Sequence, residues 1–176
     1  MRITDAQWVP STPHQTWAAL FDPGVLQRCL PGCIHVRRVT DTEYAITVRA
    51  KVGGLDAEYA GEVLVSDAEA AQCCSLAFDG KGAAAGLAIG TADVRLSPKD
   101  NGTRISYVVT ATAGGKLAAL GEPAILKAAG KIIDRFFTAF GDHLASVPRQ
   151  ARPRRRPLQN PAACPPHAGP GSWRWR

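Results

Sequence analysis

The feature that most constrains the fold is a long amphipathic stretch at residues 122–147. Its large apolar side chains recur every three or four positions, which places them on one stripe of an α-helix. Pro123 at an early helical position and Pro148 after the last turn mark the two ends. At ~1.5 Å per residue such a helix is about 40 Å long, so it can lie across a whole small sheet.

Most of the chain before this helix alternates apolar and polar residues with period two, which is typical of half-buried antiparallel strands. The predicted strands are residues 2–9, 34–39, 43–51, 55–65, 72–78, 87–96 and 103–113. Asn101-Gly102 supplies a tight turn before the last of them. Successive hairpins make a curved sheet with one apolar face, and the terminal helix is the partner large enough to cover that face.

Two short helices are predicted between the first and second strands. Thr12 and Gln15 fit a capping box that starts the first helix, and Asp22-Pro23 ends it. Residues 25–30 form a second helical turn. Helices this short need a larger element to pack on, so both are expected to lie against the sheet.

The charge divides the chain into two parts. The net charge of +6 in 176 residues invites a nucleic-acid interpretation, but seven of the 21 basic residues follow Pro148, where there is no acidic residue. Residues 1–148 hold the other 14 basic residues against 15 acidic ones. We therefore predict one near-neutral domain at residues 1–148, a basic tail at residues 149–176, and no nucleic-acid partner. The Pro-rich tail is predicted to be disordered in isolation.

The chain lacks the motifs of familiar catalytic sites, with no G-x-S-x-G, Walker, Rossmann or H-E-x-x-H pattern. Its four histidines are interpreted as ordinary solvated side chains, and no catalytic residue is predicted. Cys29 and Cys33 can be read as a metal pair, but no second ligand pair accompanies them, so small buried thiols are preferred and no metal site is predicted. With no signal peptide, all five cysteines are expected to be free thiols in the cytoplasm. The sequence contains no run of 18 or more apolar residues, so no membrane span is predicted.

Several motifs resemble those of one family. They are WAALFDP at residues 17–23, CLPGC at 29–33, VGGL at 52–55, GKG at 80–82 and above all GGKLAALG at 114–121. Together they resemble the carbon monoxide dehydrogenase G subunit (CoxG-like) family, a branch of the START/Bet v 1-like (SRPBCC) superfamily. The resemblance covers residues 2–147 and leaves the tail outside.

The resemblance implies an α+β helix-grip fold. In that fold about seven antiparallel strands form a curved sheet wrapped around a long C-terminal helix, two short helices follow the first strand, and an apolar cavity lies between helix and sheet. The resemblance also implies a non-catalytic accessory role beside a molybdenum hydroxylase of the carbon monoxide dehydrogenase type. Such a protein would associate with the inner membrane face and carry a menaquinone- or ubiquinone-like lipid, with no covalent or metal cofactor.

Two other functions stay open at this point. The same fold hosts cyclases and hydrolases, so the cavity would suit an enzyme acting on an aromatic or polyketide-like substrate. A structural adaptor without a cavity is the third possibility. The polar content of the interior discriminates between them, because a carboxylate or histidine deep inside beside a tyrosine favours catalysis, whereas a lining of carbon atoms favours carriage.

The candidate ligand-binding residues are the large apolar and aromatic side chains of the predicted interior. They are Trp17, Leu30, Tyr44, Tyr59, Leu76, Phe78, Leu87, Tyr107, Phe136, Phe137 and Phe140. The three tyrosines offer hydroxyls to a quinone carbonyl, since apolar ligand sites carry a few polar groups. The alternative is that these side chains fill a solid core, and which alternate strand positions face the helix stays open. Small residues on the strands favour a space, namely Ala45, Ala57, Gly61, Ala77, Ala88, Gly90 and Ala92.

The tail combines a cluster of arginines with terminal tryptophans. The candidate membrane-binding residues are Arg152, Arg154, Arg155, Arg156, Trp173 and Trp175. Near an anionic leaflet each arginine contributes roughly 1 kcal/mol, and tryptophan prefers the headgroup level. A solvated tail, or one that binds RNA or an acidic protein, is the alternative. The Gly-rich residues 80–90 are interpreted as a hairpin tip that gates the cavity.

Overall fold

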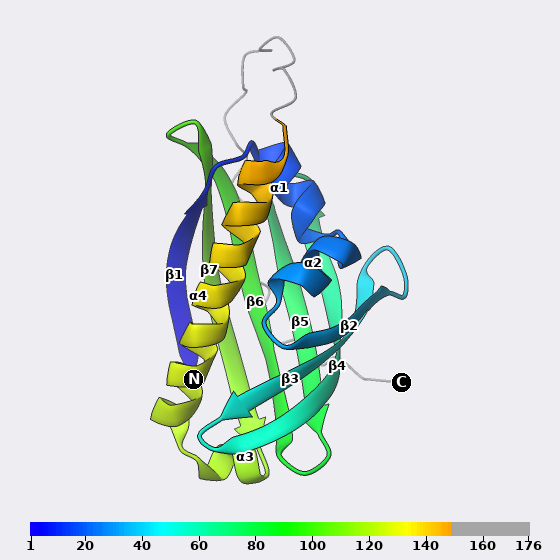
Figure 1. The fold of residues 1–176 in the computed structure, drawn as a ribbon, viewed down its shortest axis with the longest axis vertical. Helices are drawn as coiled ribbons and strands as arrows, with labels where there is room; N and C mark the ends of the chain where they lie inside the picture. The colour runs from blue at the N-terminus through cyan, green and yellow to red at the C-terminus, as the bar shows by residue number, and fades with distance from the viewer. Residues whose placement is uncertain (149–176) are drawn as a thin grey trace.

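The computed structural model describes residues 1–148 and contains the predicted curved antiparallel sheet beneath a long terminal helix (Figure 1). Its seven strands pair in the order β1-β7-β6-β5-β4-β3-β2. From β2 onward each strand therefore lies beside its predecessor in the chain, and β1 pairs with β7. The strands are β1 (Arg2–Val9), β2 (Cys33–Arg38), β3 (Glu43–Val52), β4 (Leu55–Glu69), β5 (Cys73–Gly82), β6 (Gly86–Lys99) and β7 (Gly102–Gly114).

Within residues 1–148 four helices accompany the sheet. They are α1 (Pro13–Leu20), α2 (Pro23–Cys29), α3 (Lys116–Ala119) and α4 (Glu122–Ser146). Figure 1 shows α4 lying across one face of the sheet, with α1 and α2 beside its C-terminal half. The backbone of α4 lies closest to α2, β1, β3 and α1. This is the helix-grip arrangement that the sequence resemblance implies.

The ends of the two short helices follow the sequence in part. The Thr12 hydroxyl accepts the backbone N–H of Gln15 at 3.3 Å, as the capping box predicts. The side chain of Gln15 accepts the Thr12 hydroxyl instead of returning to the backbone. Asp22 also caps a helix, because its Oδ1 accepts the N–H groups of Gly24 and Val25 at 2.7 and 3.1 Å. This cap starts α2 two residues earlier than predicted.

The predicted Gly-rich turn at residues 80–90 is largely strand. Pairing of β5 with β6 continues through Lys81–Leu87 to Gly82–Gly86, so that residues 83–85 alone form the tip. Glycines permit a turn but do not require one, and here the ladder hydrogen bonds extend through them. The tip is also better packed than predicted, since Ala85 is buried.

The core consists of three separate clusters. Phe140 is fully buried among Val9, Ile105 and Leu144 where α4 meets α1, α2 and the ends of β1, β6 and β7. A second cluster surrounds Tyr59 at the α3 end. A third forms where α1 and α2 cover β2 to β6. Helix α4 is therefore fixed by dense packing near both of its ends.

Two glycines of the face beneath α4 sit where no side chain fits. A Cβ at Gly61 would overlap the carbonyl oxygen of Asp79 on the neighbouring strand. A Cβ at Gly90 would overlap the carbonyl oxygen of Thr110 and lie 2.8 Å from Cζ of Phe78. Backbones approach this closely only where glycine stands, and such positions allow a sheet to bend sharply. The two glycines therefore contribute to the curvature of the sheet.

Replacement of Gly90 by alanine is expected to lower the free energy of unfolding by about 1–3 kcal/mol, because the new methyl group must displace a neighbouring backbone. Gly130→Ala in α4 is the matched control, since a Cβ there meets nothing within 4 Å. That variant should be more stable than the parent by about 0.5–1 kcal/mol, because alanine favours helix. Urea denaturation of both variants measures the difference, and equal effects would contradict the tight approach at Gly90.

Candidate functional site

The apolar set of alternating β4 residues, which includes Tyr59, Val63 and Val65, lies on the face of the sheet beneath α4. Tyr59 and Val65 are buried there, and Val63 lies between them. On β7 the same face carries Tyr107, whose ring stacks on Phe137 of α4 with centroids 5.5 Å apart. The inward parity that was open from the sequence is thereby settled.

Small residues meet in the middle of this face. Pairing brings Gly61, Gly80, Ala88 and Ala113 into one row across β4, β5, β6 and β7. The next row continues the pattern with Gly90 and Ala111. Cζ of Phe78 lies close to Gly90 in this row. We call these six glycines and alanines the small-residue floor. A sheet surface without bulky side chains leaves room beneath a helix that is fixed at its ends.

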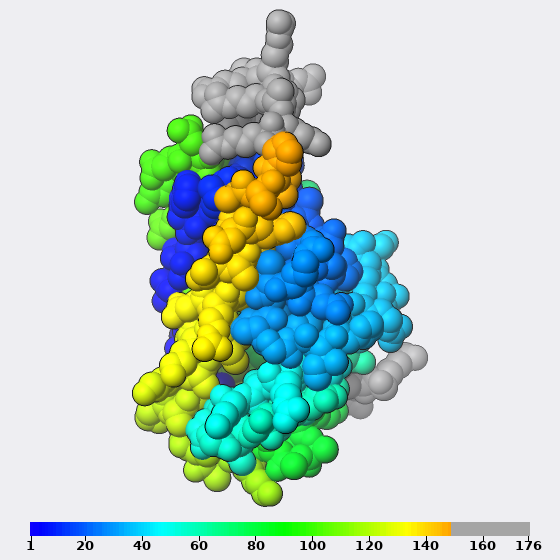
Figure 2. Space-filling view, in the orientation of Figure 1, coloured from blue at the N-terminus to red at the C-terminus, as the bar shows by residue number. Residues whose placement is uncertain are grey.

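Large apolar side chains lie on this floor and around it. Phe78 is half-buried and belongs to none of the three clusters formed by residues 1–148. Ile46 and Val63 on the strands and Phe136 on α4 are also half-buried. In Figure 2, α4 and α2 lie side by side, with the β3–β4 hairpin below them and deeper strands visible in the gap between the three. We call this space the interior hollow.

The other predicted ligand-binding residues occupy different places around the hollow. Trp17, Leu30 and Leu76 pack with Tyr44 at the α1–α2 end. Tyr59 lies at the α3 end. These side chains therefore flank opposite ends of the interior.

Three predictions about the interior need correction. Leu87 is 36% exposed and lies on the outer face, because the neighbouring Ala88 is the residue that packs inward. Ala45 and Ala77 also lie on the outer face, since each adjoins an inward residue, Tyr44 and Leu76 respectively. Phe140 is a core residue with no exposed surface. Period-two patterns give the spacing of a strand but not its facing direction when both sets of positions carry apolar or small residues.

Two of the three predicted tyrosine hydroxyls already have partners. Tyr44 Oη donates to the carbonyl oxygen of Phe21 at 3.0 Å and accepts from Arg38 Nη2 at 2.9 Å. Tyr107 Oη donates to Asp5 Oδ2 at 3.4 Å. Burial raises the pKa of Tyr107 above its ordinary value, so the phenol is protonated at neutral pH. Tyr44 thus fastens α1 to the sheet, and Tyr107 joins β7 to β1.

The Tyr107–Asp5 contact is a tyrosine beside a carboxylate, the combination that would favour catalysis if it lay deep inside. Asp5 is exposed on the edge strand β1, where it also accepts from Gln7 Nε2 at 3.3 Å. His14 and His35 are exposed as well. A solvated carboxylate at the rim is not placed for acid–base work in an apolar interior.

The cysteines behave as small apolar side chains where they are free. Cys29, Cys33 and Cys74 are free thiols, and burial raises the pKa of Cys74 to about 11, which keeps it protonated. Cys73 is disulfide-bonded, so the prediction of five free thiols is wrong at this position. Within residues 1–148 no group of three or more His, Cys, Asp and Glu side chains is arranged to hold a metal ion.

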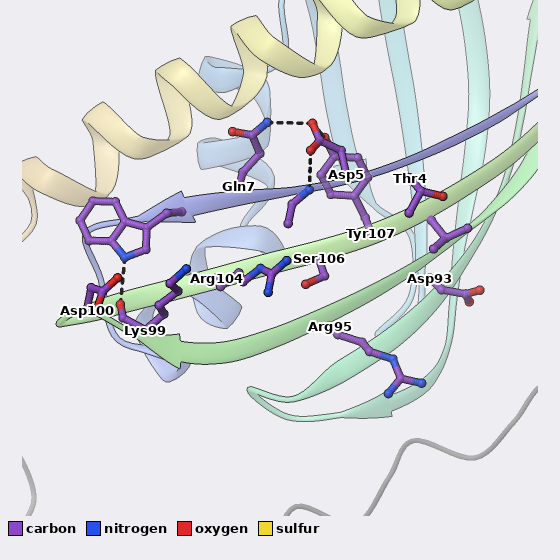
Figure 3. Close-up of a pocket in the computed structure, with 13 residues that line it drawn as sticks. Thr4, Asp5, Gln7, Asp93, Arg95, Lys99, Asp100, Arg104, Ser106 and Tyr107 are labelled. Atoms are coloured by element: carbon purple, nitrogen blue, oxygen red, sulfur yellow. Dashed lines mark hydrogen bonds between the residues drawn. The ribbon is translucent and has the colours of Figure 1, made fainter.

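A second concavity, of about 680 Å³, lies against β1, β6 and β7 (Figure 3). Its lining includes the polar side chains of Arg95, Lys99, Arg104 and Thr4, but more of its surface is apolar than polar. Trp8 lies at its edge, with Nε1 donating to the carbonyl oxygen of Lys99 at 2.9 Å. In Figure 3 Asp5 and Gln7 point towards α4, whereas Arg95 points away from it. No pattern in the sequence indicates this groove.

The predicted membrane-binding residues of the tail, from Arg152 to Trp175, lie outside the described residues. Within the described part of the chain, none of the helices combines the length and the apolar character needed to cross a bilayer.

Comparison with known proteins agrees with this architecture. A conserved protein from Geobacillus kaustophilus superposes with a TM-score of 0.77 at 23% identity, covering 82% of this chain and 95% of its own. A protein from Thermus thermophilus superposes with a TM-score of 0.62 at 15% identity, covering 84% of this chain and 100% of its own. A START superfamily protein from Mycobacterium smegmatis superposes with a TM-score of 0.61 at 12% identity, covering 82% of this chain and 97% of its own. At such identities the likeness establishes the START-like fold alone. No curated protein matches the chain.

The family relationship rests on the sequence. The family model for the carbon monoxide dehydrogenase G subunit (CoxG) matches residues 7–145, which is nearly the whole of the described domain. The match spans the end of β1, α1, α2, β2 to β7, α3 and almost all of α4. The chain therefore belongs to the carbon monoxide dehydrogenase G subunit (CoxG) family.

Proposed function

We propose that this protein is a non-catalytic accessory protein that holds a quinone-like lipid in the interior hollow. It serves a molybdenum hydroxylase of the carbon monoxide dehydrogenase type at the inner face of the membrane. The observation that carries the proposal is the small-residue floor beneath a helix whose packing is dense at its ends. Membership of the CoxG family supports the partner enzyme.

The chemistry of the hollow suits a flat apolar ligand. Its border is made of aliphatic and aromatic side chains, with Cζ of Phe78 close to Gly90 and Phe136 stacked on Phe140 at 5.3 Å. Aromatic side chains of this kind offer faces for stacking against a quinone ring, which prefers offset-stacked contact. Charged groups stay at the rim, where Asp5 is exposed, so a neutral ligand would meet no uncompensated charge.

Native mass spectrometry of the full chain purified from its own host is expected to show a bound neutral lipid. Organic extraction should release it with the ultraviolet spectrum of a quinone. Apolar ligands fill apolar cavities and remain bound through purification when the site buries most of their surface. A spectrum with the mass of the chain alone would contradict carriage.

A matched pair of variants locates the ligand. Ala88→Phe places a ring on the small-residue floor and should reduce bound lipid at least several-fold by filling the space. Leu87→Phe adds the same side chain at the neighbouring position on the outer face and should retain the lipid. Circular dichroism checks that both variants fold, and equal lipid content in the two would place the ligand elsewhere.

The partner enzyme is tested by cross-linking the tagged full chain inside its host. Subunits of a molybdenum-containing hydroxylase should be recovered with the tagged chain. Depletion of bound lipid should not abolish this recovery, because contacts between the two proteins hold the complex together. Recovery of other enzymes without molybdenum subunits would contradict this part of the proposal.

Membrane association is assigned to the tail and tested by flotation with anionic liposomes. Substitution of Arg152, Arg154, Arg155 and Arg156 by Gln in the full chain should abolish flotation, and added salt should weaken it in the parent, because exposed charges are screened. Neutral phosphatidylcholine liposomes serve as the control. Equal flotation of parent and variant would remove the arginines from the anchor, and binding to RNA instead would favour the alternative.

A further inference from the structure

Tyr59 carries a buried hydroxyl that has no hydrogen-bond partner among the described residues. Its Oη is closed off from solvent, and the side chain is 9% exposed. A hydroxyl buried without a partner is costly and rare, because it has lost water without gaining a replacement. Burial also raises the pKa of this phenol, so it remains a donor at neutral pH. Such a group needs an explanation that a purely structural role does not supply.

The environment of Tyr59 shows that its position is specified. The ring lies over Gly82, where a Cβ would approach Cε1 of the tyrosine to 2.9 Å. The surrounding cluster is otherwise carbon, with Val52, Ala85 and Leu117 as buried members. Phenylalanine would fill this place equally well without the cost of an orphaned hydroxyl. The hydroxyl is therefore the part of the side chain that the packing does not require.

The other buried orphan, Thr16 Oγ1, lies in α1, at the opposite end of the molecule from α3 (Figure 1). Tyr44 and Tyr107, the other two tyrosines of the concave face, donate to Phe21 and Asp5 respectively. Among the three tyrosines, Tyr59 is thus the one whose donor is uncommitted. It stands next to the small-residue floor, since its neighbour two positions along β4 is Gly61.

The helices beside Tyr59 lack side-chain caps. Helix α3 has four residues and lies between Gly115 and Gly121, both with positive φ. No side chain caps α3 or the start of α4 by a hydrogen bond. Leu117 on α3 reaches the Tyr59 cluster, and its N–H donates to the carbonyl oxygen of Ala85 at 2.7 Å. Because the hydroxyl is closed off from solvent-sized space, its contact with a ligand requires this short helix to move.

We propose that Tyr59 Oη donates a hydrogen bond to a carbonyl oxygen of the ligand. This carbonyl lies at the ligand end under α3, and the hydrogen bond orients the ligand. The ligand class is an apolar ring compound with a carbonyl acceptor, and this inference rests on the proposed function. The rest of the ligand extends along the small-residue floor towards Phe136. The donor selects a carbonyl-bearing ring over a pure hydrocarbon of the same shape.

The test compares 2,3-dimethyl-1,4-naphthoquinone with 2,3-dimethylnaphthalene, which has the same rings without the two oxygens. The methyl groups block the ring positions to which the free thiols would otherwise add. Equilibrium dialysis against the full chain measures both affinities. Tyr59→Phe should weaken binding of the quinone about five- to tenfold, as expected for one lost hydrogen bond, and change binding of the hydrocarbon less than ~2-fold.

Thr91→Val is the control, because it removes a hydroxyl from an exposed position on the outer face of β6. It should leave both affinities near those of the parent. Infrared difference spectra of the bound quinone give an independent readout: a carbonyl band lowered by hydrogen bonding in the parent should return to the frequency of the free carbonyl in Tyr59→Phe. The ligand-free Tyr59→Phe protein should melt at the same or a higher temperature than the parent, since it loses an unpaired polar group.

The outcomes separate this inference from the proposed function. If the parent binds both compounds and Tyr59→Phe keeps the preference for the quinone and its shifted carbonyl band, the role of Tyr59 is overturned while carriage stands. If the parent binds neither compound, carriage of such rings is overturned and the role of Tyr59 falls with it. A ligand-free Tyr59→Phe protein that is markedly less stable would show that the hydroxyl serves the fold, which also overturns the inference.

Discussion

The structure depends on the need to cover the apolar stripe of α4. A helix with so wide a stripe cannot face water, and the sheet covers it by bending, which requires strands to approach closely at positions such as Gly61 and Gly90. The bend brings both ends of α4 into dense clusters, one around Phe140 and one around Ile125. The glycines and alanines that lie between these ends contribute little bulk, so the same devices that bend the sheet keep its middle open.

Much of this arrangement could be predicted from the sequence, because long periodic segments carry a strong signal. The stripe of α4 and the alternation of β4 each repeat often enough to identify the element. The facing direction of β6 could not be read, because Leu87 and Ile89 alternate with Ala88 and Gly90, and the bulkier pair faces outward. Helix α3 was missed since four residues show no period. Asp22-Pro23 does end α1, as predicted, but Asp22 also caps α2, a second role that the prediction does not include.

The candidate site was predictable as a set of residues but not as a geometry. Tyr44, Tyr59 and Tyr107 are indistinguishable in sequence, yet in the fold two of them fasten elements together and one keeps an unpaired hydroxyl. That difference depends on distant partners, namely Phe21, Arg38 and Asp5, which no local pattern reveals. Likewise the small-residue floor exists only because pairing brings glycines and alanines of four strands into register. Long-range contacts of this kind separate a list of candidate residues from a binding site.

The open middle of the molecule has a consequence for its life in the cell. An unfilled space beneath a helix costs stability roughly in proportion to its volume, about 24 cal/mol per Å³ in core cavities. A ligand that occupies it only in the folded state adds stability through mass action. If the hollow is occupied as proposed, empty molecules unfold more often and are degraded sooner than loaded ones. The abundance of the carrier would then follow the supply of its cargo without any dedicated regulator.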